Sequence, residues 1–594
     1  MEKKKQDLSV FKAIRRTVPM IIKAVPFSCL FYVFFAILHG STWGLLAPVN
    51  QRLYDALANL AVGQGTLRYV YIAAAMVTML MLFQQAMNAI HNFFFSVMHE
   101  KASGRLARLV HDKMNVLPAQ VFEDKDRLDD IEKAGPGRDG AIYMYGTLSD
   151  GIFFYGSYYV IMGIYLWQMQ PLLLLAFAFV FAPVLLSQIV EAKLWAKLEE
   201  VSAPIRRQNS HYEDCLIGLK NMKETRIFGA FYFFKRLFMD SLTLLAQKEW
   251  DVHKKITAIT VGLNAIKGAG WVGILALLFH SLVQGNITVG AFAAVFASVG
   301  MLFSLIEEIF NRIKWSVAEN LGRIHNFINL LDIPIPEKAY AEPDFSLGIT
   351  ATNIEFTYPK AEKNAVDGVS ITLRSGETLA LVGENGSGKT TLVKLLCGLY
   401  KPDKGQVIIG GQNTSETADT ALFAKTSGVF QNYGQYVFNL DENVRISAIN
   451  SGHNPIPAMV DADVDYKDEN TFPNGLETIL NREFEGVDLS GGQWQRVATA
   501  RGLYRHHNFI VLDEPTAAID PIEETRVYKR FAELTHNKIA ILVTHRLGSA
   551  RIADRIAVMD GGKIVEIGSH ESLLANNGKY AEMWASQAEN YTTA

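Results

Sequence analysis

Long apolar stretches dominate the first half of the chain, and short apolar runs separated by polar turns fill the second half. Six of the long stretches each reach the roughly 20 residues that a helix needs to cross the hydrocarbon of a bilayer. They lie near 26–49, 68–96, 148–168, 171–192, 256–282 and 287–310. Six such stretches in succession exceed what the core of an ordinary soluble protein buries. The pattern therefore predicts an all-α membrane domain with six spans.

The connections between these stretches alternate in charge. The links at 167–171 and 282–288 are short and contain no Lys or Arg, whereas the long links at 97–140 and 193–255 are rich in both. Positively charged connections stay on the cytoplasmic side of a membrane. We therefore expect a multi-pass protein of the cell inner (plasma) membrane, with its N-terminus, both long links and its second half in the cytoplasm.

Both long links continue a helical pattern beyond the apolar stretches. In the first link, Leu106, Val110 and Met114 recur at helical spacing, and the second link behaves likewise. The pattern predicts helices that extend from the membrane into the cytoplasm. We expect each to have a short turn at its far end, near Phe122–Asp130 and Arg207–Leu216.

Two flanking segments complete the organisation. Residues 8–24 alternate apolar and basic positions, which is typical of an amphipathic helix at a membrane surface. Prolines at 334, 336 and 343 indicate a connection between the two halves. The expected domains are an N-terminal elbow over 1–25, a membrane domain over 26–315, a linker over 316–345 and a soluble α/β domain over 346–594.

A glycine-rich stretch organises the soluble half. It consists of Gly383, Glu384, Asn385, Gly386, Ser387, Gly388, Lys389, Thr390 and Thr391. A predicted buried strand precedes it and a helical pattern follows it, which is the context that a phosphate-binding loop requires. Backbone N–H groups converge there on phosphate oxygens, while Lys389 supplies a full charge and Thr390 offers a hydroxyl to Mg²⁺. The stretch predicts that the chain binds a nucleoside triphosphate.

Polar side chains follow several apolar strands of this half. Asp513 and Glu514 end one strand and His545 ends another. In α/β sheets, ligands bind at the carboxyl ends of the strands. We expect Asp513 to hold Mg²⁺, Glu514 to orient and deprotonate the attacking water, and His545 to contact the γ-phosphate. Tyr358 ends an upstream strand, where its ring is placed to stack on a base.

Composition narrows the function less than the motifs do. The 57 Lys and Arg nearly balance the 60 Asp and Glu, so no charge excess argues for nucleic acid. Cys29, Cys215 and Cys397 lie too far apart for a metal or disulfide motif, which favours reduced, structural thiols. The N-terminal segment has no pattern of a cleavable signal.

Four motifs in one order make the soluble half resemble the nucleotide-binding domain of ABC transporters. They are the phosphate loop, Leu489-Ser490-Gly491-Gly492-Gln493, Leu512-Asp513-Glu514-Pro515 and Thr544-His545. Six preceding spans with two long cytoplasmic links resemble the exporter-type half-transporter, in which membrane and nucleotide-binding domains are fused. Trp494 and the segment 122–134 are similar to bacterial lantibiotic and peptide exporters, and the chain as a whole is most similar to these and to multidrug exporters.

The resemblance implies roles for residues that their own pattern leaves undefined. Gln431 is implied to be the Q-loop residue, acting both at the metal and in catalysis. Ala517–Asp520 is implied to be the D-loop, with Asp520 at the nucleotide. The turns near 122–130 and 207–216 are implied to be coupling helices, and the ligands are implied to be ATP and Mg²⁺.

The resemblance also implies a dimer. Ser490, Gly491, Gly492 and Gln493 open a helix, which makes them a second anion site. In the family this signature faces the phosphate loop of a second subunit, and one chain carries only one of each element. Because Glu514 and His545 are present along with the signature, a homodimer is the simpler expectation, although pairing with a different half-transporter stays open.

The leading function is an ATPase that exports an amphipathic substrate, such as a peptide, drug or lipid, by alternating access. An importer of a siderophore or vitamin-like molecule on the same architecture is the alternative. An ATP-gated channel or regulator is a further one.

Polar residues within the expected spans bear on the substrate. Gln84, Asn88 and His91 share one helical face, and Lys267 lies at membrane depth. Two interpretations stay open: hydrogen bonding between helices, or a hydrated cavity whose cationic wall favours carboxylates.

Overall fold

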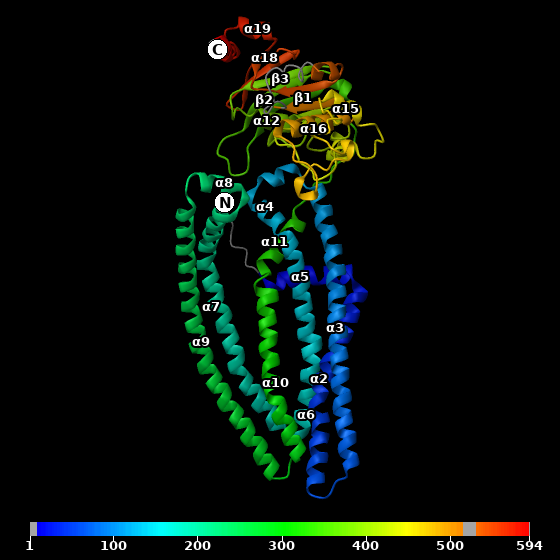
Figure 1. The fold of residues 1–594 in the computed structure, drawn as a ribbon, viewed down its shortest axis with the longest axis vertical. Helices are drawn as coiled ribbons and strands as arrows, with labels where there is room; N and C mark the ends of the chain where they lie inside the picture. Colours follow the sequence, from blue (N-terminus) through cyan, green and yellow to red (C-terminus); the bar gives the residue numbers. More distant parts are fainter. Residues whose placement is uncertain (1–8, 515–529, 593–594) are drawn as a thin grey trace. The chain divides into compact units, whose positions relative to one another are not determined.

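The computed structural model describes residues 9–514 and 530–592 (Figure 1). The chain divides into two units. The helical unit comprises residues 1–115 and 129–333, and the α/β unit comprises residues 116–128 and 334–594. The short segment 116–128, which the chain order places among the helices, therefore packs with the α/β unit.

The first unit consists of helices and the turns between them, with no strand among its described residues. Its elements are α1 (Val10–Ala24), α2 (Pro26–Ala61), α3 (Leu67–Val116), α5 (Ala134–Ser149), the π turn η2 (Asp150–Phe154), α6 (Tyr155–Met169), α7 (Pro171–Ile217), α8 (Leu219–Ile227), α9 (Phe231–Val283), α10 (Val289–Ile313), the π turn η3 (Lys314–Ala318) and α11 (Leu321–Asp332). In α1 the residues Ala13, Thr17 and Ile21 are buried while Phe11 is exposed, as the amphipathic pattern predicts.

Five of the described helices are long and apolar enough to cross a membrane, by length and composition. They lie in Pro26–Ala61, Leu67–Val116, Pro171–Trp195, Phe231–Val283 and Val289–Val317. The remaining expected span, 148–168, is divided among the end of α5, the turn η2 and α6. The π turn interrupts the α-helical hydrogen bonding at Asp150, so neither helix reaches a spanning length alone. The sixth span stays a prediction.

Two expected features lie elsewhere than the sequence indicates. The turn expected near Arg207–Leu216 is wrong in position, because α7 continues through these residues to Ile217. The chain turns at Gly218, where a Cβ atom would lie 2.5 Å from the carbonyl oxygen of Asp214. The polar residues 207–216 are compatible with a helix in water, so they do not end α7. The close approach at Gly218 requires glycine, and the chain turns there.

The segment 316–345, expected to be a linker, contains a helix. In α11 the side chains of Ile324, Phe327 and Ile328 are buried, and the helical unit extends to residue 333. Only the proline-containing residues after it lack regular structure until a 3₁₀ turn at Phe345–Leu347. The apolar face of α11 is short and contains no long apolar run, so the sequence pattern does not indicate this helix.

The α/β unit contains two sheets. A four-stranded antiparallel sheet has the order β2-β1-β4-β5, and a six-stranded sheet has the order β10-β9-β3-β8-β7-β6. The strands are β1 (Ile349–Phe356), β2 (Val366–Leu373), β3 (Thr378–Gly383), β4 (Lys404–Ile409), β5 (Gln412–Asn413), β6 (Thr426–Val429), β7 (Phe509–Asp513), β8 (Ile539–Val543), β9 (Arg555–Asp560) and β10 (Lys563–Gly568). The hairpin predicted around Asp560 and Gly561 is confirmed, because β9 and β10 pair in antiparallel orientation.

Helices and short turns join these strands. The α-helices among them are α12 (Lys389–Leu396), α13 (Asp419–Leu422), α14 (Leu440–Arg445), α15 (Ile456–Asp461), α16 (Gly491–Tyr504), α18 (Leu547–Ala550), α19 (His570–Ala575) and α20 (Lys579–Thr592), while α4 (Lys125–Glu132) precedes the strands and spans the boundary of the two units at residue 128.

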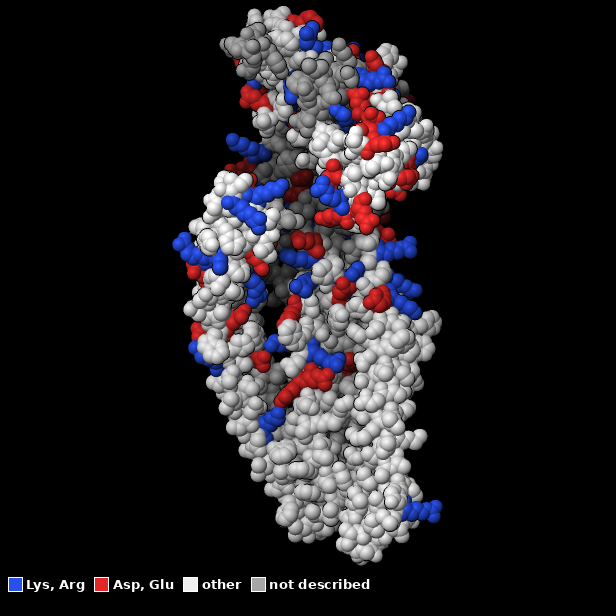
Figure 2. All heavy atoms as spheres, viewed as in Figure 1, with Lys and Arg blue, Asp and Glu red and all other residues white. Residues whose placement is uncertain are grey.

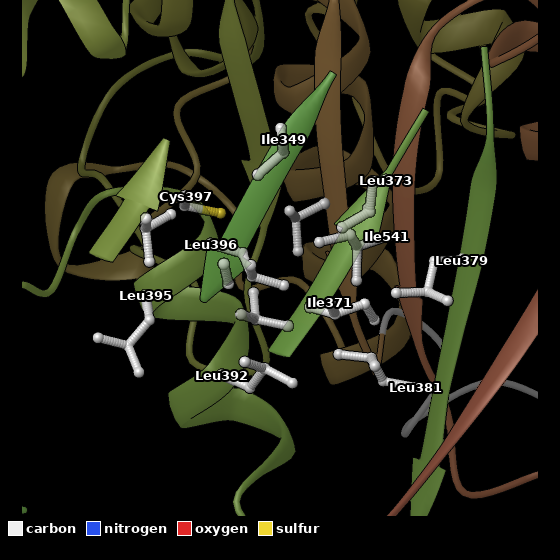
Figure 3. Packing of buried hydrophobic residues seen from close by; sticks show 14 of the residues in the cluster. Ile349, Ile371, Leu373, Leu379, Leu381, Leu392, Leu395, Leu396, Cys397 and Ile541 are labelled. Atoms are coloured by element: carbon white, nitrogen blue, oxygen red, sulfur yellow. The ribbon is translucent and has the colours of Figure 1, made fainter. Parts of the chain in front are cut away.

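One apolar core joins the two sheets to α12 (Figure 3). It includes Ile349 and Leu373 from the antiparallel sheet, Leu381 and Ile541 from the parallel strands, and Leu392 from α12, all of them fully buried. Strands β3, β7 and β8 are buried along their whole length, which suits central parallel strands covered on both faces. This core fixes the carboxyl ends of the strands, where the candidate site lies.

Candidate nucleotide-binding site

The glycine-rich loop runs from the end of β3 to the start of α12, as the sequence predicts. Gly383, Gly386 and Gly388 all have positive φ values. A Cβ atom at Gly383 would lie 2.2 Å from the carbonyl oxygen of Met559, and one at Gly388 would lie 2.3 Å from that of Ala365. Glycine is therefore required at both places for the backbone to curve toward the first turn of α12. Such a curve presents backbone N–H groups to an anion.

Lys389 is held across this loop. Its Nζ donates to the carbonyl oxygens of Gly383, at 3.0 Å, and Glu384, at 2.9 Å. The residue is only 5 % exposed. Burial lowers the pKa of Lys389, and the charges of Glu514 and Asp513 partly offset this effect. A desolvated ammonium beside a helix N-terminus suits the phosphates of a nucleotide, which would replace the lost hydration.

Asp513 and Thr390 form a hard-oxygen pair beside this lysine. Thr390 Oγ1 donates to Asp513 Oδ1 at 3.4 Å, while Asp513 Oδ2 is buried with no hydrogen-bond partner among the described residues. Burial raises the pKa of Asp513, and the hydrogen bond from Thr390 lowers it in part. The negative charge of Glu514 adds to the increase. An orphaned carboxylate oxygen next to a hydroxyl matches the oxygen ligands that Mg²⁺ prefers. These residues fit the expected metal.

Glu514, Gln431 and His545 meet although they follow three different strands. The carboxylate of Glu514 contacts His545 Nε2 with one oxygen, and its Oε2 accepts from Gln431 Nε2 at 3.1 Å. The main chain of Glu514 has a φ of +53°, a conformation that bulky side chains seldom adopt. Neighbours hold it there: its N–H donates to Val543, and its carbonyl oxygen accepts from Gln495 Nε2 at 3.3 Å. The side chains of His545 and Gln431 thus fix the orientation of the Glu514 carboxylate from two sides.

The signature residues lie at the start of α16. Ser490 Oγ accepts from the N–H of Gln493 at 3.3 Å, and Gln493 Oε1 accepts from the N–H of Ser490 at 2.8 Å. This reciprocal cap leaves the N–H groups of Gly491 and Gly492 at an accessible helix terminus. Within the described residues, no hydrogen bond joins this segment to the phosphate loop. Asp520 and the other expected D-loop residues lie outside the described residues.

Tyr358 lies just after β1 and next to α12. Its hydroxyl shares a hydrogen bond of 3.1 Å with Thr391 Oγ1, and its ring packs edge-on against Phe356 and Tyr400. The ring is half-buried rather than fully exposed. The placement brings Tyr358 to the phosphate loop, and stacking on a base stays a prediction.

A contact that the sequence does not reveal links segment 116–128 to α12. The hydroxyl of Tyr400, a residue 2 % exposed, donates to the carboxylate of Glu123, 277 residues away. Lys394 of α12 donates to the same hydroxyl at 3.0 Å and lies 3.6 Å from Glu123. Gln120 Nε2 adds a bond of 2.7 Å to the carbonyl oxygen of Lys401. No local motif marks these residues, because the pairing depends on the fold.

Comparison with known families agrees with this geometry. Residues 366–517, which contain the phosphate loop, the signature and the strand ending in Asp513, match the family described as ABC transporter. These residues form an ABC transporter domain. In this chain the ABC domain is joined to a unit of long apolar helices.

Curated relatives match part of the chain. The subtilin transport ATP-binding protein SpaT of Bacillus subtilis is 34% identical over 381 residues, 60% of this chain and 61% of that protein. The ATP-dependent lipid A-core flippase of Methylobacillus flagellatus is 33% identical over 55% of this chain and 56% of that protein. The nisin transport ATP-binding protein NisT of Lactococcus lactis is 34% identical over 40% of each. The matches span about half the length of these relatives.

A solved structure extends the likeness to nearly the whole chain. The structure of a bacterial Atm1-family ABC exporter with ATP bound superposes with a TM-score of 0.73 at 23% identity, covering 97% of this chain and 98% of that chain. At this identity the likeness concerns the fold. The chain is thus a multi-pass membrane protein in which an ABC domain follows a helical unit of the exporter fold.

Proposed function

We propose that this chain is an ATP-driven exporter that hydrolyses ATP at the ends of β3, β6, β7 and β8. The single observation that carries the proposal is the meeting of Glu514, Gln431 and His545 beside the phosphate loop. Two groups that follow separate strands would not converge on the carboxylate of a third strand in a merely structural turn. The ABC transporter match over 366–517 supports the same nucleotide chemistry.

Each residue has a distinct part in this chemistry. Lys389 and the loop N–H groups bind the phosphates, and Thr390 with Asp513 Oδ2 would hold Mg²⁺, which would neutralise phosphate charge. Glu514 acts as the general base that orients and deprotonates the water. His545 and Gln431 hold the Glu514 carboxylate in place, and they contact the γ-phosphate and the metal once a nucleotide is bound. Tyr358 covers the base.

The site is completed by a second copy of the chain. The helix opening at Ser490–Gly492 is an anion site with no hydrogen bond to the phosphate loop of its own chain among the described residues. In a homodimer the signature of each copy faces the phosphate loop of the other. ATP then joins the two domains and hydrolysis separates them.

Motion passes to the helices through segment 116–128. This segment continues α3 in the chain, yet its Glu123 and Gln120 are fastened to Tyr400, Lys394 and Lys401 of the ABC domain. Lys394 stands one turn after Thr390 on α12, so a shift of the phosphate loop on ATP binding displaces the partner of Glu123. The contact converts occupancy of the site into movement of α3.

The substrate is amphipathic, and export from the cytoplasm across the plasma membrane is the direction we propose. Two relatives are named for transport of subtilin and nisin and one as a lipid A-core flippase. These names favour export of a peptide or a lipid over import of a siderophore or vitamin-like molecule.

ATP-dependent uptake into inside-out vesicles tests this function. Vesicles containing the protein should accumulate members of a panel of labelled peptides and lipids when ATP is added, and not with a non-hydrolysable analogue. Uptake into right-side-out vesicles loaded with ATP, without uptake into inside-out ones, would establish import instead. ATP hydrolysis without transport of any panel member in either orientation would contradict the exporter assignment.

A further inference from the structure

Charged side chains gather within the apolar part of the helical unit. Figure 2 shows a group of red and blue side chains part-way along this unit, in surroundings that are mostly white. Three ion pairs fasten α10 and η3 to other helices: Lys267 with Glu307 at 2.7 Å, Arg312 with Asp150 at 3.1 Å, and Lys314 with Glu191 at 3.0 Å. Charges at this depth are costly and are retained for a function more often than for stability.

The pairs containing lysine are balanced, but the one around Arg312 is not. Arg312 donates to Asp150 Oδ2 and also to Glu308, at 2.9 Å and 3.0 Å from its two nitrogens. We name Asp150, Glu308 and Arg312 the acidic triad. It contains two carboxylates and one guanidinium, so it has a net charge of one negative unit.

Histidines beside the triad do not supply the missing charge. Trp43 Nε1 can only donate, and it lies 3.0 Å from His39 Nε2, which must accept. His39 therefore carries its proton on Nδ1 and donates to His91 Nδ1 at 3.3 Å. His91 in turn carries its proton on Nε2, which lies 3.3 Å from Asp150 Oδ1 without forming a hydrogen bond.

This chain of hydrogen bonds fixes both imidazoles as neutral. A proton added to His39 would face the indole N–H, and a proton added to His91 would face the N–H of His39. Tyr32 donates a further bond to Asp150 Oδ1 at 2.6 Å. Asp150, with a side chain only 10% exposed, thus accepts from Tyr32 with one oxygen and from Arg312 with the other, and the excess charge falls at the Glu308 end.

The Glu308 end is open and has a spare acceptor. The side chains of Glu308 and Arg312 are 45% and 48% exposed. Lipid would not solvate charged groups that are exposed to this extent. Tyr155 lies close enough to interact with Glu308, Arg312 and Asp150. Its hydroxyl is buried, at 2 % exposure for the residue, and faces Glu308 as a donor, but no group that donates to it lies among the described residues. A buried phenol oxygen left without a donor needs one.

We propose that the acidic triad binds one cationic group of the transported molecule, an ammonium or a guanidinium, against Glu308 with the hydroxyl of Tyr155 as second acceptor. The inference rests on the proposed transport function and names the substrate chemistry that this function leaves open. It replaces the cationic wall inferred from Lys267, because Glu307 neutralises that lysine. A ligand with a carboxylate would meet the excess negative charge instead.

Equilibrium binding in lipid nanodiscs, without nucleotide, tests the site independently of ATP hydrolysis. Three probes share one scaffold and differ in charge: phenylbutylammonium, phenylbutanol and phenylbutanoate. Saturable binding above that of empty nanodiscs should favour the ammonium over the carboxylate by about tenfold or more, which is the difference expected from one charged contact.

The variant Glu308→Gln should weaken binding of the ammonium about tenfold, to the level of the alcohol, while Glu308→Asp keeps most of it. The matched control is Glu307→Gln, the same change at the adjacent acid that Lys267 already neutralises. It should have a clearly smaller effect. Retained binding of ATP by each variant shows that the protein is folded.

Equal affinity for ammonium and carboxylate in the wild type would overturn the proposal. So would equal effects of Glu308→Gln and Glu307→Gln. A protein that binds the ammonium at Glu308 but shows no ATP-dependent uptake in vesicles would leave the cation site standing and refute the transport function, so the two failures are distinguishable.

Discussion

The two units treat buried charge in opposite ways. In the ABC domain, Lys389 and Asp513 are desolvated and their strongest possible partners are missing: the lysine bonds to main-chain oxygens, and Asp513 Oδ2 has no partner among the described residues. In the helical unit, Lys267, Arg312 and Lys314 each meet a carboxylate of another helix. In the ABC domain ligand binding supplies the charge that compensates these groups, whereas in the helical unit the fold supplies a carboxylate for each of the three cations.

A consequence concerns stability. Charges paired within the helical unit contribute to holding its helices together, so removing one partner leaves the other uncompensated. The nucleotide site, by contrast, already holds uncompensated groups, and its variants are expected to alter binding or turnover rather than folding.

The largest effect on stability is expected at Arg312. The variant Arg312→Met leaves two carboxylates, one of them buried, without a cation. We expect it to lower the unfolding free energy of the helical unit by about 3 kcal/mol. Thermal unfolding in detergent measures this loss. Lys267→Met is the control: it leaves only the more exposed Glu307 alone, so its loss should be about 1 kcal/mol or less. Equal losses for both variants would remove the distinction between the pairs.

A smaller effect is expected at Tyr400. The variant Tyr400→Phe keeps the ring and removes only the hydroxyl that joins Glu123 to Lys394. We expect stability to fall by about 1 kcal/mol. Basal ATP hydrolysis should persist, while stimulation by transported substrate should fall severalfold, because segment 116–128 loses its tie to α12. Tyr504→Phe, which removes a buried hydroxyl elsewhere in the ABC domain, is the matched control. Unchanged stimulation in Tyr400→Phe would show that the contact transmits nothing.

The smallest effect is expected at Tyr358. Removing the ring in Tyr358→Ala should weaken binding of ATP by about 1 kcal/mol, the contribution of one stacked aromatic pair. Tyr358→Phe should restore most of that affinity. The Tyr358 hydroxyl also forms a hydrogen bond with Thr391. If Tyr358→Phe loses as much affinity for ATP as Tyr358→Ala does, the effect belongs to this hydroxyl and not to stacking.

Much of the ABC domain was predictable because its signals are local. The glycines at 383, 386 and 388 precede a helix directly, and Asp513 with Glu514 follows a buried strand directly. Parallel strands then bring such ends together by topology alone. The contact of Gln431 with Glu514, by contrast, could not be predicted from the sequence, because it depends on the direction in which the Gln431 side chain leaves the chain after β6.

The helical unit was predictable as a set of long helices and little further. Periodicity places Gln84, Asn88 and His91 on one face of α3 but says nothing of what that face touches. The structure buries His91 between Tyr32 and His39, whereas Asn88 is exposed and accepts from Asn92. Partners in this unit are distant in the chain, as Asp150 and Arg312 show, so the triad has no local signature.

Glu514 offers the most direct test of the proposed chemistry. In vesicles containing Glu514→Gln, we expect ATP to bind as in the wild type, while phosphate release falls about a hundredfold or more and ATP-dependent substrate uptake stops with it. Glu533→Gln, an exposed acid of the same domain, should leave all three quantities unchanged. Phosphate release near the wild-type rate in Glu514→Gln, or uptake that continues without it, would contradict hydrolysis at this site as the driving reaction.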